Sequence, residues 1–434
     1  MSDNGTPHTS EPSTGSDPST GSSPSTTSAP LTTSAQRGVI GSGLLFAANG
    51  AFIAALLPWY PTLVARLGLT PAQFGMMAAS IAVGALASSA APPPLIRKFG
   101  LRRVMIAGFG ATAVVMAGAG WVTSGIVLAG FIALAGFMDA IVDVAQNVTG
   151  VRVENSLGKS VLSSMHACWS LGAAAAGAVA TWAASSGVPI QAHLAISSAV
   201  SLGVGLAGVW LVGHYALGSD THDTSDAPPP PGTTPQRRTR VFWLVLPLVI
   251  LAISGAVIED VANNWASMAG VYLAGVRVDA AGVFFTLMVG AQAVGRFTGD
   301  AMINRLGRVR VARIGGTLIT VGAIIAVVST APVPLIIGLV AMGFGCATIV
   351  PSAYAVAAAL PGVSSSTGVT IVSWLLRVGF LATSPLIGAL TGLTSLRVGL
   401  TVPVIAGVAV ILLAPRLRVS VTSATEPKSR QPRQ

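Results

Sequence analysis

Twelve long apolar stretches alternate with short polar segments along the chain, and one longer polar segment separates the first six from the last six. Each stretch can cross a bilayer, because a hydrocarbon core of about 30 Å needs about 20 apolar residues in a helix. The stretches lack the two-residue alternation of barrel strands, so we predict an all-α membrane protein. The predicted spans are residues 38–60, 72–94, 103–122, 126–150, 163–185, 190–213, 241–262, 279–303, 311–330, 333–358, 367–391 and 396–415.

Composition supports a membrane protein. The chain is 52% hydrophobic and 9% charged, whereas soluble domains are about 25% charged. Its 50 glycines suit helices that approach closely in lipid, where small residues let backbones meet.

Basic residues predict the orientation. All but five of the 24 Lys and Arg residues lie on one side if the N-terminus is cytoplasmic. The exceptions are Arg66, Arg277 and Arg397 in loops on the other side, with Arg296 and Arg377 inside spans. This asymmetry predicts that both termini are cytoplasmic. The net charge of +10 is spread over short loops, which indicates contact with the lipid bilayer and no nucleic-acid partner.

Polar segments divide the chain into five parts. Residues 1–36, rich in Ser, Thr and Pro, are predicted to be a disordered cytoplasmic tail, and residues 417–434 a basic cytoplasmic tail. Residues 217–240 contain four consecutive prolines and are predicted to be a cytoplasmic linker. It joins an N-terminal six-helix half at 37–216 to a C-terminal six-helix half at 241–416.

The two halves look like repeats. A shift of 207 residues aligns glycines at equivalent places in the two halves, and it also aligns two basic turns. Two parallel six-helix halves that rock against each other are the architecture of alternating access. The aligned positions are Gly68 and Gly275, Gly75 and Gly282, Gly136-Phe137 and Gly343-Phe344, and the turns Gly100-Leu101-Arg102-Arg103 and Gly307-Arg308-Val309-Arg310.

The loops after the second and eighth spans share glycines and basic residues. In the first loop these are Arg97, Gly100, Arg102 and Arg103, and the second has Gly299, Asp300, Arg305, Gly307, Arg308 and Arg310. The pattern resembles the cytoplasmic loops of the major facilitator superfamily, although Pro92–Pro94 and Ile96 stand where that pattern has a glycine and an acid. The resemblance implies a fold of 12 transmembrane helices and a gating role for these loops.

A finer resemblance, to the fucose:proton-symporter-like branch, covers most of the chain. It is carried by Asp139, Asp143, Asn147, Gly150, Val153, Glu154, Gly158, His166, Ala167, Trp169, Ser170, Gly172, Glu259, Trp265, Gly295, Arg296, Gly299 and Asp300. Fucose symporters also have an acid in their first helix. Here that helix offers Asn49, and no acid lies between Asp17 and Asp139.

The fourth span carries two acids one helical turn apart, Asp139 and Asp143, with Asn147 one turn further on. A charged residue at mid-bilayer costs about 2.5–3.5 kcal/mol on insertion scales, so two together indicate a function. A carboxyl group that is neutral when occluded and ionised when facing water can carry a proton. We predict that at least one of the two does so. The alternative is a structural ion pair or hydrogen bond between helices.

The seventh span carries Glu259 and Asp260, followed by Asn264 and Trp265. Neighbouring helical positions point about 100° apart, so only one of the two acids can face a central cavity. These residues, with Asn49 and Asn147, are candidates for the substrate cavity or an outer gate. A solvated helix end with an interfacial Trp is an equally good interpretation.

Two arginines lie within predicted spans. Arg296 and Asp300 are four residues apart and can pair with each other, which favours a structural or gating role. Arg377 has no acid on its own helix. Asp139, Asp143 or Asp300 could neutralise it, or an anionic substrate could bind it, since Arg binds carboxylates in a fork.

Helix ends carry the remaining candidates. Arg152 and Glu154 are predicted to pair in a cytoplasmic gating loop, and His166 begins the fifth span nearby. His166 fits an interfacial histidine or, because histidine titrates near pH 6.5, a proton relay. Trp59 and Tyr60 are predicted to be interfacial aromatics.

We interpret the chain as a secondary active transporter of a small polar solute, either sugar-like or another small organic molecule, with protons as the coupling ion. A proton-antiport exporter of drugs or metabolites and a non-transporting, receptor-like protein remain open. No motif predicts an enzyme, a metal site or a cofactor, and no phosphate-binding loop for ATP is present. Arg far outnumbers Lys, which suggests a GC-rich bacterium, so we expect the protein in the bacterial inner membrane, which is the cell membrane. We also expect a monomer.

Overall fold

The computed structural model describes residues 33–157, 161–217, 235–360 and 365–418. All regular secondary structure in these ranges is helical, which confirms the predicted all-α fold. The tail at 1–32, the linker at 218–234 and the tail at 419–434 lie outside the described residues.

The first half of the molecule comprises elements α1 to α8. Their bounds are α1 Thr33–Ala54, α2 Tyr60–Leu67, α3 Pro71–Ala87, α4 Pro92–Phe99, α5 Leu101–Gly118, α6 Gly125–Leu157, α7 Leu162–Ser185 and α8 Ile190–Val212, with 3-10 turns at Leu57–Trp59, Ala119–Trp121 and Gly213–Ala216. Capping follows the sequence: Thr70 accepts a hydrogen bond from the Gln73 backbone, and the Gln73 side chain accepts one from the Thr70 backbone, which together form a capping box that begins α3.

The second half comprises α9 to α17. Their bounds are α9 Pro235–Asp260, α10 Ala266–Ala274, α11 Gly282–Leu306, α12 Arg308–Val328, α13 Pro332–Cys346, α14 Ile349–Ala358, α15 Ser365–Leu393, α16 Leu396–Gly399 and α17 Thr401–Leu413, with a π-helical turn at Val261–Trp265 and a 3-10 turn at Ala414–Leu417.

Each predicted span contains a helix or a run of helices. In the described part of the chain ten such runs are long and apolar enough to cross a membrane, or eleven if α3 and α4, bent by 55°, form one span. The 25-residue α11 is long enough but carries polar residues such as Gln292 and Arg296. The predicted span at 241–262 stops short, because the helical run continues to Ala274 through the π-turn.

Two predicted segment boundaries are also corrected. Helix α1 begins at Thr33, inside the predicted tail 1–36, and α9 begins at Pro235, inside the predicted linker 217–240. In both cases the helix extends beyond the apolar stretch by one or two polar turns. Hydrophobicity alone therefore marks the membrane-buried part of such a helix and not its end.

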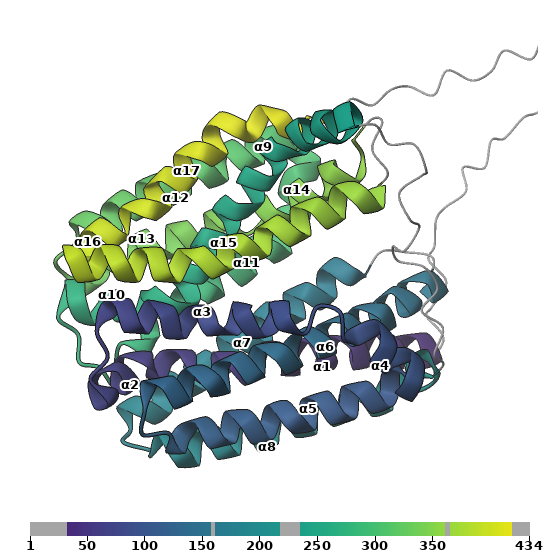
Figure 1. Cartoon of the computed structure of the whole chain (residues 1–434), viewed down its shortest axis with the longest axis horizontal. Coiled ribbons are helices and arrows are strands. Elements are labelled where there is room, and N and C mark those ends of the chain that lie inside the picture. Colours follow the sequence, from purple (N-terminus) through teal and green to yellow (C-terminus); the bar gives the residue numbers. More distant parts are fainter. Residues whose placement is uncertain (1–32, 158–160, 218–234, 361–364, 419–434) are drawn as a thin grey trace, which may run out of the picture.

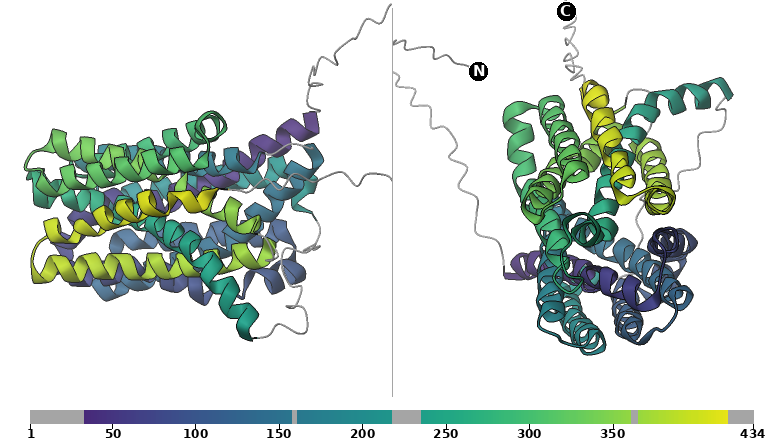
Figure 2. Two further views of the ribbon diagram at one scale, coloured as in Figure 1. Left: turned by 90° about the horizontal axis from the view of Figure 1, so that it is seen from above. Right: turned by 90° about the vertical axis from the view of Figure 1, so that its left-hand side faces the viewer.

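The halves form two groups of helices that lie one above the other in Figure 1. Across the boundary, α3 packs on α15 and α7 packs on α11. Both described chain ends lie at the same end of the bundle, which we call the proximal end (Figures 1 and 2). The opposite end, with the segments 55–70 and 275–281, is the distal end.

Internal packing repeats with the predicted shift of 207 residues. Gly136 lies against the carbonyl oxygen of Ile81, and Gly343 lies against the carbonyl oxygen of Met288, so both partners are related by the same shift. A Cβ at either glycine would clash with that backbone. Close backbone approach through glycine is the usual way for helices to pack in lipid, and it serves both halves at the same place.

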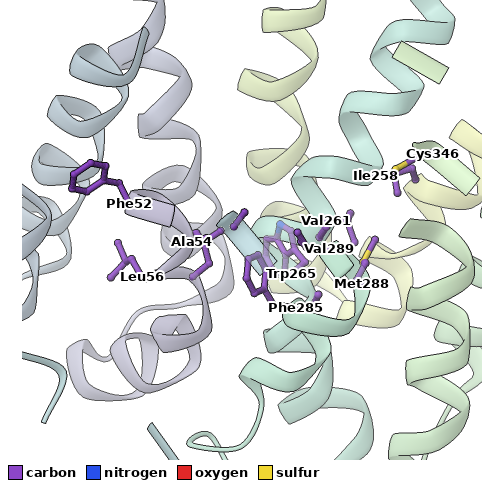
Figure 3. Packing of buried hydrophobic residues seen from close by; sticks show 14 of the residues in the cluster. Phe52, Ala54, Leu56, Ile258, Val261, Trp265, Phe285, Met288, Val289 and Cys346 are labelled. Atoms are coloured by element: carbon purple, nitrogen blue, oxygen red, sulfur yellow. The ribbon is translucent and has the colours of Figure 1, made fainter. Parts of the chain in front are cut away.

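Apolar packing joins the halves toward the distal end. Figure 3 shows Phe52 and Ala54 of the first half opposite Trp265, Phe285 and Met288 of the second half. All five side chains are at most 2% exposed. This packing fixes the position of the two halves around the polar residues described next.

Candidate functional site

The two acids predicted on α6 lie in a small polar cluster. Asp143 accepts hydrogen bonds from Asn147 Nδ2 at 3.0 Å and Gln146 Nε2 at 3.2 Å. Asn49 on α1, 4% exposed, lies within hydrogen-bonding reach of Asp139, and the two carboxyl groups interact electrostatically. Asp139 and Asp143 are both half-buried. Asn147 is therefore held by its own helix, whereas Asn49 connects α1 to the acids.

Asp143 faces the space between the halves. It lies within electrostatic reach of His166 on α7 and Arg377 on α15, so groups from both halves surround it. His166 packs edge-on against Phe46, with ring centroids 4.9 Å apart, yet its side chain remains exposed. Asp143 and Arg377 are half-buried, so none of the three groups is sealed into the helix packing. His166 thus belongs to the acid cluster and is not only an interfacial histidine.

Arg296 pairs with Glu259, and not with Asp300 as the sequence suggested. The Arg296 guanidinium forms a short ion pair with Glu259, which also accepts a hydrogen bond from Gln292 Nε2 at 2.9 Å. Asp300 is exposed. The prediction is wrong because a carboxylate on the neighbouring helix α9 satisfies the guanidinium.

The same arginine connects the two halves. Arg296 Nη1 donates a hydrogen bond of 2.5 Å to Ser170 on α7, and the guanidinium lies 6.0 Å from the ring centroid of Trp169. A cation over an indole face is attracted by its electron density. Glu259 and Arg296 therefore form a polar connection between halves at the level of the acid cluster.

Asp260 belongs to a second, separate network. Its carboxylate accepts hydrogen bonds from Ser384 Oγ at 2.5 Å and Asn264 Nδ2 at 2.9 Å, and Trp265 Nε1 donates to Ser384 at 3.1 Å. Asp260 is 4% exposed and Trp265 is fully buried. The interpretation of this region as a solvated helix end with an interfacial Trp is therefore wrong. The adjacent Glu259 and Asp260 contact different helices, α11 and α15.

The Asp260 network touches the first half near the distal end. The ring centroid of Trp265 lies 5.0 Å from that of Phe74 on α3, at an edge-to-face angle of 79°. Gly75 on the same helix lies against the Ser384 backbone, where a Cβ would clash. On the other side of the boundary, Thr181 and Thr286 form a hydrogen bond of 3.3 Å. The halves are in close contact here.

Two aromatic residues predicted at the membrane interface are buried instead. Trp59 is 5% exposed and donates a hydrogen bond of 3.0 Å to His193 Nδ1. Tyr60 is 3% exposed and packs edge-on against Phe74. The run of helix continues to Leu67, so these aromatics lie inside the bundle and add to the distal contact.

Arg377 lacks the acidic partner that the sequence left open. Among the described residues, no carboxylate forms an ion pair with it, and its hydrogen bond is to the carbonyl of Ala85 at 3.5 Å. Tyr354 on α14 lies within electrostatic reach of Arg377, Asp143 and Glu259.

Sequence reasoning missed several polar partners. Tyr354 and Ser384 are hydroxyl residues in apolar helices, and Asp260, the partner of Ser384, is far away in sequence. Ser170 entered only through the family resemblance, and its partner Arg296 is also distant in sequence. Gln292 offered a signal, because it lies one helical turn before Arg296. No group of three or more His, Cys, Asp or Glu side chains suited to a metal occurs among the described residues.

The two basic loops at the proximal end have matching backbones. Gly100 and Gly307 have φ values of 79° and 81°, a conformation that glycine adopts readily and other residues do not. Each glycine ends one helix and begins the next. The flanking side chains are exposed at Arg97, Arg102, Arg103 and Arg305, and half-buried at Arg308.

Arg152 and Glu154, predicted from the sequence to pair in a loop, lie in the last turns of α6 and contact the segments after α8 and before α7. Arg152 Nη1 donates hydrogen bonds to the carbonyls of Tyr215 at 3.2 Å and Leu217 at 2.8 Å. Glu154 accepts a hydrogen bond of 2.8 Å from the Val161 backbone. These contacts join the proximal ends of α6, α7 and α8 within the first half.

The sequence matches the profile of the Major Facilitator Superfamily over residues 42–272 and 260–434. An uncharacterised MFS-type transporter of Yersinia pestis is 26% identical over 365 residues, which cover 83% of this chain and 90% of that protein. Among solved structures, the nucleoside transporter NupG is 14% identical with a TM-score of 0.62, covering 89% of this chain and 98% of NupG. A D-xylose–proton symporter is 15% identical with a TM-score of 0.65, covering 88% and 96%.

Proposed function

This chain belongs to the Major Facilitator Superfamily and is a multi-pass membrane transporter; from this premise we propose that it moves a small polar solute by alternating access, coupled to protons. The observation that carries the proposal is the cluster between the halves. It contains Asp143 from α6, His166 from α7 and Arg377 from α15, and none of the three is fully buried. Asp143 and His166 can exchange a proton while the halves rearrange, and the charge of Arg377 from the other half acts on Asp143.

Asp139 and Asp143 are the proposed proton carriers. A carboxylate that must pass through an occluded state is less costly when neutral, because ions in a low-dielectric interior pay a large desolvation cost. The two amide donors stabilise Asp143 when it is ionised, and the neighbouring carboxylate of Asp139 favours Asp143 when it is protonated. Both protonation states of Asp143 are therefore stabilised by groups on α6. His166 can relay protons to it from the proximal side.

The contacts at the distal end support a gate there. With both termini in the cytoplasm, as the basic residues predict, the distal end faces outward. The Asp260–Ser384 network and the aromatic contact between Trp265 and Phe74 then close the outer side. The exposed proximal arginines, among them Arg103 and Arg305, act in the cytoplasmic gating loops. We expect a monomer in a bacterial cell membrane.

The experiment is a proton-flux assay with purified protein in proteoliposomes containing a pH dye. Pools of sugars, nucleosides, organic acids and cationic drugs are added one class at a time. We expect one class to drive protons inward with the solute, and Asp139→Asn or Asp143→Asn to abolish this coupling. Asp279→Asn, in the loop before α11 where Asp279 pairs with the exposed Arg277, is the matched control. Uphill uptake that survives in both α6 variants would refute the proton role.

The direction of proton movement distinguishes the alternatives. Protons that move against the solute would identify an exporter of drugs or metabolites with the same carriers. The solved nucleoside transporter and D-xylose–proton symporter make polar, sugar-like solutes the first class to test. Folded protein that gives no proton or solute movement with any class would favour a non-transporting relative.

A further inference from the structure

Two arginines lie between the halves, and they differ in how fully they are bound. The Arg296 guanidinium is held by Glu259 and Ser170. The Arg377 guanidinium has a single, long hydrogen bond of 3.5 Å to the Ala85 carbonyl and, within the described residues, no ion pair. A guanidinium has five N–H donors, so most of those on Arg377 are available to another group.

Arg377 faces the space that Asp143 faces. Its neighbours come from three other helices: Ala85 on α3, Asp143 on α6 and Tyr354 on α14. Arg377 and Tyr354 are both half-buried, so neither is sealed into the helix packing. The Tyr354 hydroxyl has Ser373 on α15 as a hydrogen-bond partner and lies within electrostatic reach of the guanidinium, and a phenol hydroxyl can form a second hydrogen bond to a solute.

The charge on Arg377 needs an anion nearby. An intramembrane arginine is costly unless it is paired or faces water, and Asp143 is the acid within its electrostatic reach. When Asp143 is ionised, it offsets the charge of Arg377 across the gap. When Asp143 binds a proton, that charge is no longer offset, and a carboxylate from the solute can take its place.

We propose that the solute is a small organic monocarboxylate, which binds Arg377 through its carboxylate and Tyr354 through a hydrogen bond, and that Asp143 is protonated in the same complex. This inference rests on the proposed proton-coupled transport. Arginine suits the role because its planar fork binds both oxygens of a carboxylate. The proton removes the negative charge of Asp143, and the solute carboxylate supplies a negative charge to Arg377 in its place. Binding of one therefore favours binding of the other, which links their movements.

Other groups around Asp143 are consistent with this exchange. On its own helix it meets Asn147, Gln146 and the acid Asp139, and α7 contributes His166. The amides stabilise an ionised Asp143 when no solute is bound. A further carboxylate beside an ionised Asp143 would be repelled, so proton and monocarboxylate bind together or not at all.

One consequence is a transport cycle without net charge. A monocarboxylate carries one negative charge and the coupled proton one positive charge. A membrane potential therefore does no work on the loaded transporter. A neutral solute with one proton would instead be drawn in by an inside-negative potential, so the two solute classes are distinguishable by this measurement.

The test uses proteoliposomes with the full chain and three acids, D-gluconate, D-glucuronate and L-lactate, each compared with its uncharged amide. Empty liposomes correct for passive entry. We expect an inward proton gradient to drive uptake of at least one acid at least tenfold faster than its amide, with no change when a potassium–valinomycin potential is imposed. Arg377→Gln should abolish this uptake, Arg377→Lys should retain part of it, and Tyr354→Phe should weaken solute binding without uncoupling.

The matched control is Arg313→Gln, at an exposed position of α12 outside the basic loop pattern, and size-exclusion chromatography confirms that each variant is folded. Acid uptake that is unchanged in folded Arg377→Gln would overturn the inference. So would proton-coupled uptake of a neutral sugar or nucleoside with none of any acid, although the proposed function would then stand. Absence of proton-coupled uptake of every solute would overturn both.

Discussion

At the scale of single residues, the pairing of Arg296 with Glu259 rather than Asp300 decides which charges are structural. Removing one member of a buried ion pair typically costs about 3–5 kcal/mol, because the other is left uncompensated. Here the side chains keep 20% and 22% exposure, so we expect about 2 kcal/mol for Glu259→Gln, since partial solvation weakens the pair. Asp300→Asn, exposed and outside the pair, should change stability little.

Thermal unfolding of the detergent-solubilised protein measures this difference. The double variant Glu259→Gln/Arg296→Gln should recover part of the loss, because it removes both charges together. Equal destabilisation by Asp300→Asn and Glu259→Gln would contradict the observed pairing.

The sequence identified Asp139, Asp143 and Arg377 as functional candidates because charge inside an apolar stretch is rare. It could not find Ser384 or Tyr354, since a hydroxyl in an apolar helix costs little and carries no local signal. It also misassigned the partner of Arg296, because spacing along one helix says nothing about the neighbouring helix. Contacts between helices that are distant in sequence are what the pattern leaves undetermined.

At the scale of elements, glycine positions determine which helices touch. The sequence located the helices through hydrophobicity, but it placed the end of the seventh span at 262, inside the π-turn and just before the polar residues Asn263 and Asn264 that interrupt the apolar run. Pairings such as α3 on α6 depend on a missing side chain at Gly136, which hydrophobicity does not report. In the sequence, only the alignment of Gly136 with Gly343 indicated that a helix packs closely at this position.

We expect Gly136→Val to prevent normal packing of α6 on α3, because its side chain would meet the Ile81 backbone, which cannot move away as a flexible side chain could. Gly130→Val on the same helix is the matched control, since no atom lies within 4 Å of its Cβ position. The measurement is the yield of monodisperse protein after membrane extraction. A several-fold loss is expected for Gly136→Val alone, and equal yields would show that this contact is not required.

At the scale of the whole molecule, the structure represents one state of a transporter whose halves must separate somewhere. The repeated halves follow from the sequence, as the shared backbones at Gly100 and Gly307 show. Which end is closed does not follow, because one sequence must stabilise both states within a few kcal/mol. The closed distal end is visible only in contacts between halves, such as the hydrogen bond of Thr181 with Thr286.

A disulfide across that contact tests whether the distal end must open for transport. With Cys168 and Cys346 replaced by serine, Thr181→Cys and Thr286→Cys place two thiols where hydroxyl oxygens lie 3.3 Å apart. Oxidation should link α7 to α11 and stop solute movement, and reduction should restore it, whereas either single variant should remain active under oxidation. Because alternating access requires each end to open in turn, full transport by the completely crosslinked protein would mean that the halves do not separate at Thr181 and Thr286, and that the solute takes another route.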